Sequence, residues 1–368
     1  AGIHFMKKPP FRNIVIHGIV RAADGSKMSK SKGNSLDPLE LIEQYSADAL
    51  RFSIALITSL ECDTKVNREK FEIGRNFCTK IWNAAKFIDM NRGAAAGSYD
   101  RSALTADERH ILVACDKAAE KLDALLKAYR IQDGALAVYD FIWTDICDWY
   151  LEYAKDAPDK ARAFAVLDEV FFKALKMLHP YMPFITEEVA HQIGYLKDSE
   201  SIMRAEFPKP SGAADDGVYE FVNMKREAIT ALRALRAEYK VKPGDFVKVS
   251  IGTDRDISSE IESLKKAMRA ESIDVVAKDA DLPMPSKLTA FGTVYLSLEG
   301  LVDKAAEAKR IAGELAKVAG FIKSGEAKLS NEAFVGHAPA AVVAEAKRKL
   351  EENREKAAQL EKLAKLFA

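Results

Sequence analysis

The stretch that decides the fold is Lys27-Met28-Ser29-Lys30-Ser31-Lys32-Gly33-Asn34, a loop with three lysines within six positions. The apolar run at 14–20 before it predicts a buried strand. Asp37 and Pro38 after it predict the start of a helix, as N-cap and first helical residue. A basic, glycine-flanked loop between a strand and a helix suits phosphate, because ammonium and backbone N–H donors converge there. For a lysine-rich loop of no particular sequence, a solvated loop is the commoner interpretation.

Composition bounds the class of protein. The chain has 368 residues, with 48% hydrophobic and 30% charged residues, which suits two or three domains with packed cores. Its 55 basic and 55 acidic residues give zero formal net charge, so a nucleic acid would be met by local patches. Four scattered cysteines without CxxC spacing argue against a zinc site or a disulfide framework. With no secretory signal and no apolar run of ~20 residues, we expect a cytoplasmic protein without a membrane partner.

The start of the sequence raises a separate expectation. The chain opens Ala1-Gly2 without an initiator methionine and reaches the predicted strand almost at once. A parallel sheet needs several strands and crossover connections, and there is no room for them before Phe11. We therefore expect this chain to be a fragment of a longer protein.

The middle of the chain has a helical period. From about Arg68 to Phe207, apolar residues recur at three- and four-residue spacing, which predicts a helical bundle. Thr105 and Glu108 have the spacing of a capping box. An aromatic stripe at helical spacing usually packs in a core, so Trp143 and Trp149 are assigned to the core.

The last third predicts two further units. After a linker at 208–212 and a helix at 216–240, strands at 246–251, 273–276 and 293–298 and a helix at 257–270 predict a small α/β unit. From Leu301, apolar residues step alternately by three and four. The pattern breaks at 329–339 and resumes to Phe367, which predicts an antiparallel coiled-coil hairpin. Lys304 and Asn353 on its seam predict a marginal arm.

Several strings resemble one enzyme family. Residues 27–31, KMSKS, resemble the signature loop of class I aminoacyl-tRNA synthetases. Residues 17–21, 37–38 and 45–52 resemble the valyl branch, with Ser46 where glycine is usual. Residues 140–153 and 179–188 resemble its anticodon-binding bundle, and the C-terminal repeat resembles its tRNA-binding arm. The H-x-G-H motif of the family does not occur in this chain, and the cysteine-rich module typical of the isoleucyl branch is absent.

The resemblance implies a mainly α fold with five parts along the chain. They are the end of a Rossmann-type catalytic domain with the signature loop (1–35), a connecting region near the tRNA stem (36–70), the anticodon-binding bundle with a linker helix (71–241), the small α/β unit (242–299) and the coiled-coil arm (300–368).

The resemblance also implies roles at the loop. Enzymes of this family make an aminoacyl-adenylate from an amino acid and ATP with Mg²⁺, and preorganised cations stabilise the charge that develops on the phosphates. Lys30 matches the principal triphosphate contact and Lys27 a supporting one. Met28 and Ser29 would meet the adenine side through backbone groups. His17 would touch the nucleotide, although a structural histidine beside the strand fits equally well. No bound metal is predicted in this chain.

Further residues are implied in tRNA binding. Lys80 and Phe87 lie seven apart on one predicted helix, with Lys80 for the RNA backbone or a base edge and Phe87 for stacking. A core Phe87 and a solvated Lys80 remain an open alternative. On the arm, the cations implied to contact the tRNA backbone are Lys309, Arg310, Lys317 and Arg348. A solvated charged face is the alternative there.

The implied function follows from these parts. The chain would be the C-terminal part of a monomeric enzyme that activates valine with ATP and transfers it to tRNA(Val). The amino-acid pocket and the editing site would lie upstream, so the fragment would bind tRNA but not aminoacylate it alone. Three alternatives stay open: a stand-alone RNA-binding module without catalysis, a purely structural helical protein with a coiled-coil arm, and a fragment from the isoleucyl branch.

Overall fold

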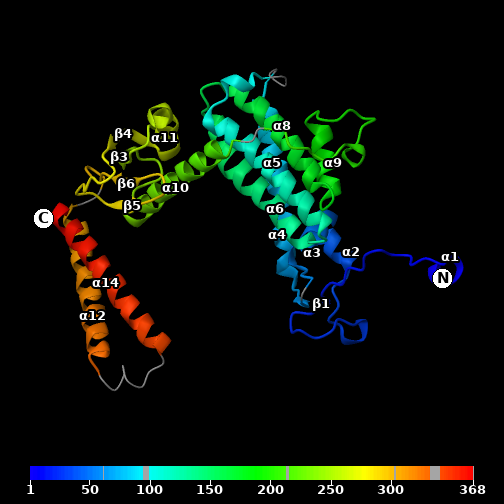
Figure 1. Cartoon of the computed structure of the whole chain (residues 1–368), viewed down its shortest axis with the longest axis horizontal. Coiled ribbons are helices and arrows are strands. Elements are labelled where there is room, and N and C mark those ends of the chain that lie inside the picture. The colour runs from blue at the N-terminus through cyan, green and yellow to red at the C-terminus, as the bar shows by residue number, and fades with distance from the viewer. Residues whose placement is uncertain (61, 94–98, 213–214, 302–303, 332–339, 368) are drawn as a thin grey trace. The chain divides into compact units, whose positions relative to one another are not determined.

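The computed structural model describes residues 1–60, 62–93, 99–212, 215–301, 304–331 and 340–367 (Figure 1). The fold is mainly α with two small sheets, as the sequence predicts. The chain divides into two compact units, Ala1–Val222 and Asn223–Ala368, which are described separately below.

The first unit opens with little regular structure. Helix α1 (Gly2–Met6) is followed by an irregular stretch, and β1 (Val20–Arg21) pairs in parallel with β2 (Thr64–Lys65). The predicted buried strand at 14–20 is therefore wrong, because only its last residue joins a strand. Ile14 and Ile16 are 82% and 80% exposed. An apolar run becomes a buried strand only when neighbouring strands and a covering layer exist, and within the described ranges only β2 pairs with β1.

Two short helices follow the loop. The predicted start at Asp37 and Pro38 is confirmed: α2 (Pro38–Tyr45) has Pro38 in its first turn, and the Leu39 N–H donates to Asp37 Oδ1 at 2.8 Å. Helix α3 (Ala47–Ile57) begins one residue after α2 ends. The hydroxyl of Ser46 caps α3 by accepting from the Ala49 N–H at 3.2 Å.

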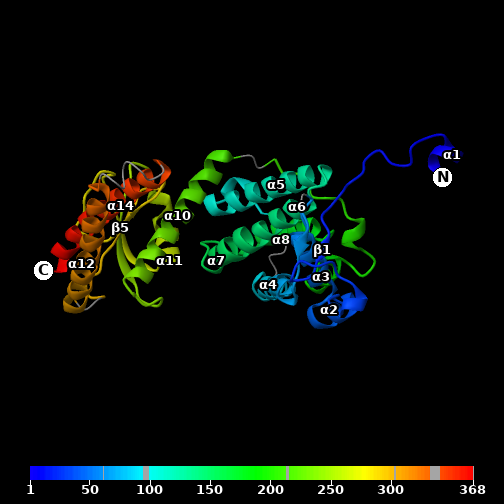
Figure 2. The same cartoon turned by 90° about the horizontal axis from the view of Figure 1, so that it is seen from below.

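The predicted helical bundle is confirmed. Its helical elements are η2 (Arg68–Phe71), α4 (Glu72–Asn91), η3 (Arg101–Ala103), α5 (Ala106–Lys127), α6 (Ile131–Asp140), η4 (Phe141–Tyr150), α7 (Leu151–Lys155), α8 (Lys160–Leu178), α9 (Pro183–Gln192) and η5 (Ile202–Arg204). Both views show α5, α6 and α8 side by side (Figures 1 and 2). One continuous core runs through them, built by the apolar residues at three- and four-residue spacing.

Local details of the bundle follow the sequence in part. The capping box at Thr105 and Glu108 is present at the start of α5. Trp143 is half-buried against the core and stacks on Tyr139, with ring centroids 5.4 Å apart. The predicted helix through 135–153 continues without interruption, but its middle segment η4 is a π-helix. A π-helix pairs residues five apart, and the three- and four-residue spacing of the apolar residues did not predict it.

One polar junction ties α3 to the bundle. Asp48 is 3% exposed, and its carboxylate accepts from the N–H groups of Ile185 at 2.6 Å and Phe184 at 3.3 Å, in the first turn of α9. Arg51, one turn later, donates to the carbonyls of residues 180 and 181, between α8 and α9. Burial raises the pKa of the Asp48 carboxyl, and the two N–H donors act in the opposite direction. A carboxylate at a helix N-terminus satisfies orphan N–H groups, so α3 and α9 are held as one piece.

The second unit contains a four-stranded sheet. Its order is β4 (Ala270–Val276), β3 (Val247–Gly252), β6 (Thr293–Leu296) and β5 (Ser286–Leu288). Strands β3 and β4 are parallel, and the other two pairings are antiparallel. The three predicted strands are confirmed, and β4 begins three residues earlier than expected. Strand β5 was not predicted, because three residues are too few to show alternation.

Helices join this sheet through buried cations. Helix α10 (Asp216–Glu238) runs into the second unit, and η6 (Ser258–Glu260) with α11 (Ile261–Met268) connects β3 to β4. Lys225 of α10 is buried and donates to Glu260 at 2.7 Å. Arg236 donates to the carbonyls of Lys242 and Asp245, both at 2.8 Å. Hydrogen-bonded in this way, these charges fix α10 against the turn before β3 and the start of α11.

The predicted antiparallel hairpin is confirmed. Helices α12 (Lys304–Leu329) and α14 (Ala340–Phe367) pack through a core of Ile311, Val318 and Leu360. Arg354 of α14 pairs with Glu326 of α12 at 2.8 Å. Part of the predicted break, 332–339, and the side chain of the seam residue Lys304 lie outside what the structure describes. The other polar seam residue, Asn353, donates to the carbonyl of Lys349 in its own helix.

The corner between α2 and α3 predicts a stabilising substitution. Ser46 has φ +94° and ψ 159°, a region that residues other than glycine adopt only with strain of about 1–3 kcal/mol. Replacing serine by glycine at a helix N-cap costs only a few tenths of a kcal/mol, and glycine's extra chain entropy about 0.5–1 kcal/mol. We expect Ser46→Gly to raise the free energy of unfolding by about 1 kcal/mol, seen as a melting temperature about 2–4 °C higher by calorimetry.

Ser46→Ala is the matched control, because alanine keeps the Cβ and hence the backbone strain but removes the hydroxyl cap. We expect it to lower the free energy of unfolding by about 1 kcal/mol. A Ser46→Gly variant that melts below the unmodified chain would contradict the strain argument.

Candidate nucleotide loop and RNA-binding surfaces

The basic loop is closed on itself by one side chain. Asn34 Oδ1 accepts from the Ser29 N–H at 2.9 Å, while Asn34 Nδ2 donates to Ser26 Oγ at 2.8 Å and to the Lys27 carbonyl at 3.3 Å. We call these three hydrogen bonds the Asn34 clasp. It joins the two ends of the loop and so sets the path of the backbone between them. Asn34 was not among the residues predicted to act in the loop.

The loop residues singled out from the sequence lie along this clasped segment. Lys27 is exposed, and Met28 and Ser29 are half-buried. Lys30 opens the short 3-10 helix η1 (Lys30–Lys32), and its side chain lies outside what the structure describes. Gly33, which ends the segment, has φ +64°, so the turn needs a residue that tolerates the left-handed region. An exposed lysine and loop N–H groups fit a polyphosphate chemically.

The strand before the loop is anchored at Asp63, a residue that the sequence analysis also missed. Asp63 accepts from the Ile19 N–H at 2.8 Å and pairs with Arg21 at 2.5 Å. The Ile19 N–H and the Arg21 guanidinium hold the pKa of this carboxyl below its usual value. Gly18 passes so close to this segment that an added Cβ would lie 1.9 Å from the Cys62 carbonyl oxygen. The base of the loop therefore has no room for a side chain at position 18.

His17 lies beside this anchor. It is exposed, and its Nδ1 lies 2.8 Å from the carbonyl oxygen of Gly18. Within the described residues, no hydrogen bond links it to the loop at 27–34. Lys27, Met28 and Ser29 follow one another in the clasped segment, whereas no hydrogen bond of the described residues joins His17 to that segment.

The two residues expected near the anticodon have partners on neighbouring helices. Lys80 Nζ lies 2.9 Å from Asp148 Oδ1 and 4.8 Å from the centre of the Trp143 ring. Burial acts to lower the pKa of Lys80, but the Asp148 contact raises it overall. Phe87 is half-buried, with its ring centre 6.1 Å from that of Phe164. Both side chains remain partly accessible, so neither role proposed for them is blocked by packing.

On the arm, the four expected cations divide into two kinds. Arg310 and Arg348 make i,i+4 ion pairs with Glu314 at 2.6 Å and Glu352 at 3.6 Å. Lys309 and Lys317 are exposed, and within the described part of the arm neither takes part in an ion pair. The unpaired lysines keep their charge available to a phosphate.

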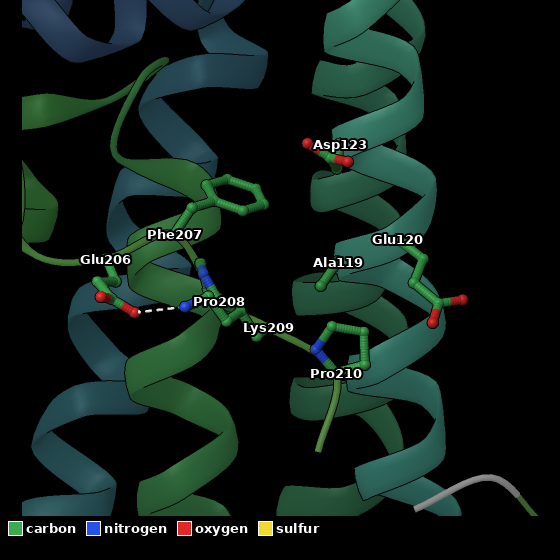
Figure 3. Close-up of a pocket in the computed structure, with 8 residues that line it drawn as sticks. All are labelled: Ala119, Glu120, Asp123, Glu206, Phe207, Pro208, Lys209 and Pro210. Atoms are coloured by element: carbon green, nitrogen blue, oxygen red, sulfur yellow. Dashed lines mark hydrogen bonds and ion pairs between the residues drawn. The ribbon is translucent and has the colours of Figure 1, made fainter. Parts of the chain in front are cut away.

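One hollow in the bundle does not suit RNA. A cavity of about 500 Å³ lies between α5 and the segment at 206–210 (Figure 3). Phe207, Pro208 and Pro210 give it apolar walls. Glu120, Asp123 and Glu206 add three carboxylates, and the single cation, Lys209, already pairs with Glu206 at 2.8 Å. Three carboxylates around one hollow repel the phosphates of RNA.

The described ranges lack a metal cluster and a membrane-spanning helix. No set of three His, Cys, Asp or Glu side chains there is grouped in a way that suits a metal ion. None of the helices in those ranges is long and apolar enough to cross a lipid bilayer.

Comparison with known proteins gives three family matches in chain order. Residues 1–67 match tRNA synthetases class I (I, L, M and V), and residues 108–251 match the anticodon-binding domain of tRNA ligase. Residues 303–366 match the valyl tRNA synthetase tRNA-binding arm. The chain belongs to the valyl branch of the class I aminoacyl-tRNA synthetases. The branch expected from the bundle strings and the arm is thus confirmed.

Three relatives of this chain are each named valine–tRNA ligase. It is 37% identical to valine–tRNA ligase of Geobacter sulfurreducens over 99% of the chain and 43% of that protein. It is 37% identical to that of Mesorhizobium japonicum (96% and 40%) and 33% identical to that of Aquifex aeolicus (100% and 33%). The chain thus spans about a third to two fifths of the length of these relatives. A solved leucyl synthetase–tRNA complex from Agrobacterium radiobacter K84 matches at 16% identity and a TM-score of 0.45, over 65% of this chain and 26% of that one, too distant to support an argument.

The Asn34 clasp predicts a change in loop dynamics. In Asn34→Ala the Ser29 N–H loses its acceptor, and one such hydrogen bond contributes about 1 kcal/mol net. Because the substitution removes all three bonds of the clasp, we expect the Ser29 amide hydrogen to exchange with solvent on the order of a hundredfold faster, measured by NMR on the folded chain.

Asn34→Asp is the control, because it keeps the acceptor for Ser29 and loses the two donated bonds. Its Ser29 amide should exchange more slowly than that of Asn34→Ala. Equal exchange rates in Asn34→Ala and the unmodified chain would contradict the clasp.

Proposed function

We propose that this chain supplies the ATP-phosphate loop and the tRNA-binding part of a valine–tRNA ligase. The observation that carries the proposal is the order of three matched segments on one chain, from the class I catalytic segment through the anticodon-binding domain to the valyl-type arm. In this proposal the reaction activates valine with ATP and transfers it to tRNA(Val). The five parts keep the bounds 1–35, 36–70, 71–241, 242–299 and 300–368.

At the loop, the proposed chemistry is electrostatic. As pyrophosphate leaves, charge grows on the phosphate oxygens, and preorganised cations stabilise that charge. Lys30 is proposed as the principal contact and Lys27 as a supporting one. Met28 and Ser29 would meet the adenine side through their backbone, and His17 is proposed as a further nucleotide contact. Mg²⁺ bound with ATP would neutralise phosphate charge, and the chain's own part is to position the lysines.

In the bundle and the arm, the proposed chemistry is RNA binding. Phosphate contacts would position the tRNA, and contacts to anticodon bases would select it. Lys80 is proposed at the RNA backbone or a base edge, and Phe87 as a stacking surface. On the arm the proposed cations are Lys309, Arg310, Lys317 and Arg348. The working protein is proposed to act as a cytoplasmic monomer, with catalysis requiring segments beyond this chain.

Binding of tRNA tests the proposed function. We expect the chain to bind a tRNA(Val) transcript about tenfold more tightly than a tRNA(Ile) transcript, the difference that one well-read base supplies. Affinity should fall steeply as salt rises, because phosphate contacts release counterions. Filter binding over a salt series measures both. Equal affinity for the two transcripts would remove the valine-specific part of the proposal, and no binding of either would overturn it.

The Lys80–Asp148 pair gives a second test of the anticodon surface. Lys80→Ala should weaken tRNA(Val) binding, because a cation is lost. Asp148→Asn should strengthen it, because Lys80 is released and a repelling carboxylate is removed. Each change should be within about fivefold, since an exposed ion pair contributes about 1 kcal/mol or less.

Lys127 is the matched control, as it makes a similar surface pair with Asp123 on α5. Lys127→Ala should leave tRNA affinity unchanged. Weaker binding by Asp148→Asn would contradict the placement of Lys80 at the RNA.

A further inference from the structure

The two helices of the arm differ in their share of carboxylates. Over its full length α12 carries six cations and three carboxylates, whereas α14 carries seven cations and five carboxylates. Two of the α12 carboxylates are engaged, Glu314 with Arg310 at 2.6 Å and Glu326 with Arg354 at 2.8 Å. Both helices of the arm are therefore net basic, and α12 has fewer carboxylates for each cation than α14.

The unpaired cations of α12 share a face. Lys309, Lys317 and Lys323 are exposed, and the ion pairs of the described arm include none of them. At about 100° per residue, Lys323 lies about 40° to one side of Lys309 and Lys317 about 80° to the other. Ile311 and Val318, which pack against α14, lie on the opposite side. The three lysines thus point away from the hairpin core, where no carboxylate of α12 interrupts them. On α14, by contrast, ion pairs hold three cations: Arg348, Lys349 and Arg354.

An aromatic ring borders the same face. Phe321 is 63% exposed and lies one turn after Lys317. It is outside the core of the hairpin, and no ring or cation contact of the described residues includes it. An exposed phenyl ring beside lysines suits a nucleic acid, because the ring can stack on a base and the lysines can bind the neighbouring phosphates.

Two glycines lower the surface between these side chains. Gly313 and Gly320 fall between Lys309 and Lys323 on the outward side of α12, and a Cβ at either position would meet nothing within 4 Å. Packing therefore does not require glycine there, although glycine disfavours a helix. With no side chain at these two positions, a ligand's backbone can approach the helix closely.

We propose that the outward face of α12, formed by Lys309, Lys317, Phe321 and Lys323, is the surface of the arm that contacts tRNA. The lysines bind phosphates, and Phe321 stacks on an exposed base. Helix α14 packs against α12 and makes no phosphate contact in this arrangement. The inference thus replaces the contact proposed above for Arg348, which pairs with Glu352 at 3.6 Å. This inference rests on the proposed function and adds to it which helix, which side chains and which kind of contact are used.

The test separates stacking from charge. In the full chain, Phe321→Ala should lower the affinity for tRNA(Val) about tenfold at every salt concentration, with the salt slope unchanged, since a stacked base is lost and no phosphate contact is. Phe321→Trp should restore the affinity. Lys317→Ala and Lys323→Ala should each reduce the slope of log K against log salt by about one.

Two α14 variants are matched controls. Lys347 is exposed and has no ion pair among the described residues, and Val342 is an exposed apolar residue of that helix. Lys347→Ala and Val342→Ala should bind tRNA(Val) like the unmodified chain, with circular dichroism showing equal helix content throughout. Unchanged affinity of Phe321→Ala, or an equal loss in the α14 variants, would overturn this inference while leaving the proposed function standing. No binding by the unmodified chain would overturn both.

Discussion

The cap that Asp48 provides for α9 is the interaction on which the first unit depends. Its carboxylate lies 136 and 137 positions along the chain from the two N–H groups that it accepts from. The same short helix contributes Ala49 to the small core beside the loop and Phe52 to the core of the bundle. Helix α3 therefore belongs to two cores at once. Because a buried carboxylate without donors would be costly, this geometry fixes α3 against α9.

Charge pairing distinguishes the candidate RNA surfaces in a chain without net charge. Asp148 and Trp143 hold the Lys80 side chain in place. An RNA phosphate could therefore replace the Asp148 carboxylate as its partner without a change in the Lys80 conformation. Among the described residues of the arm, Lys309 and Lys317 have no such partner, whereas Arg310 pairs with Glu314. A surface then attracts a polyanion where its cations have no neighbouring carboxylate. The zero net charge of the chain does not show where such surfaces lie.

Features set by neighbouring residues could be read from the sequence, and features set by distant ones could not. The Asp37 cap and the box at Thr105 and Glu108 are local, so their spacing predicted them correctly. The run at 14–20 has the composition of a buried strand, but burial depends on partners elsewhere in the chain, and that prediction failed. Asp48 and Asp63 act on backbone groups tens of residues away, and no spacing rule finds them. The role of Asn34 is local, since it closes the loop in which it lies. It still could not be predicted, because the partners of an amide depend on the path of the backbone.

The Asn34 clasp also has a consequence for how tightly the loop can hold a nucleotide. Three hydrogen bonds favour one arrangement of the segment, at about 1 kcal/mol net for each. A nucleotide that needs the lysines placed differently binds only the unclasped population, on the order of one molecule in a hundred, and its apparent affinity falls by that fraction. A partner that favours the unclasped state would raise that affinity without touching the nucleotide. The clasp thereby makes the loop a point where a second ligand can act by conformational selection.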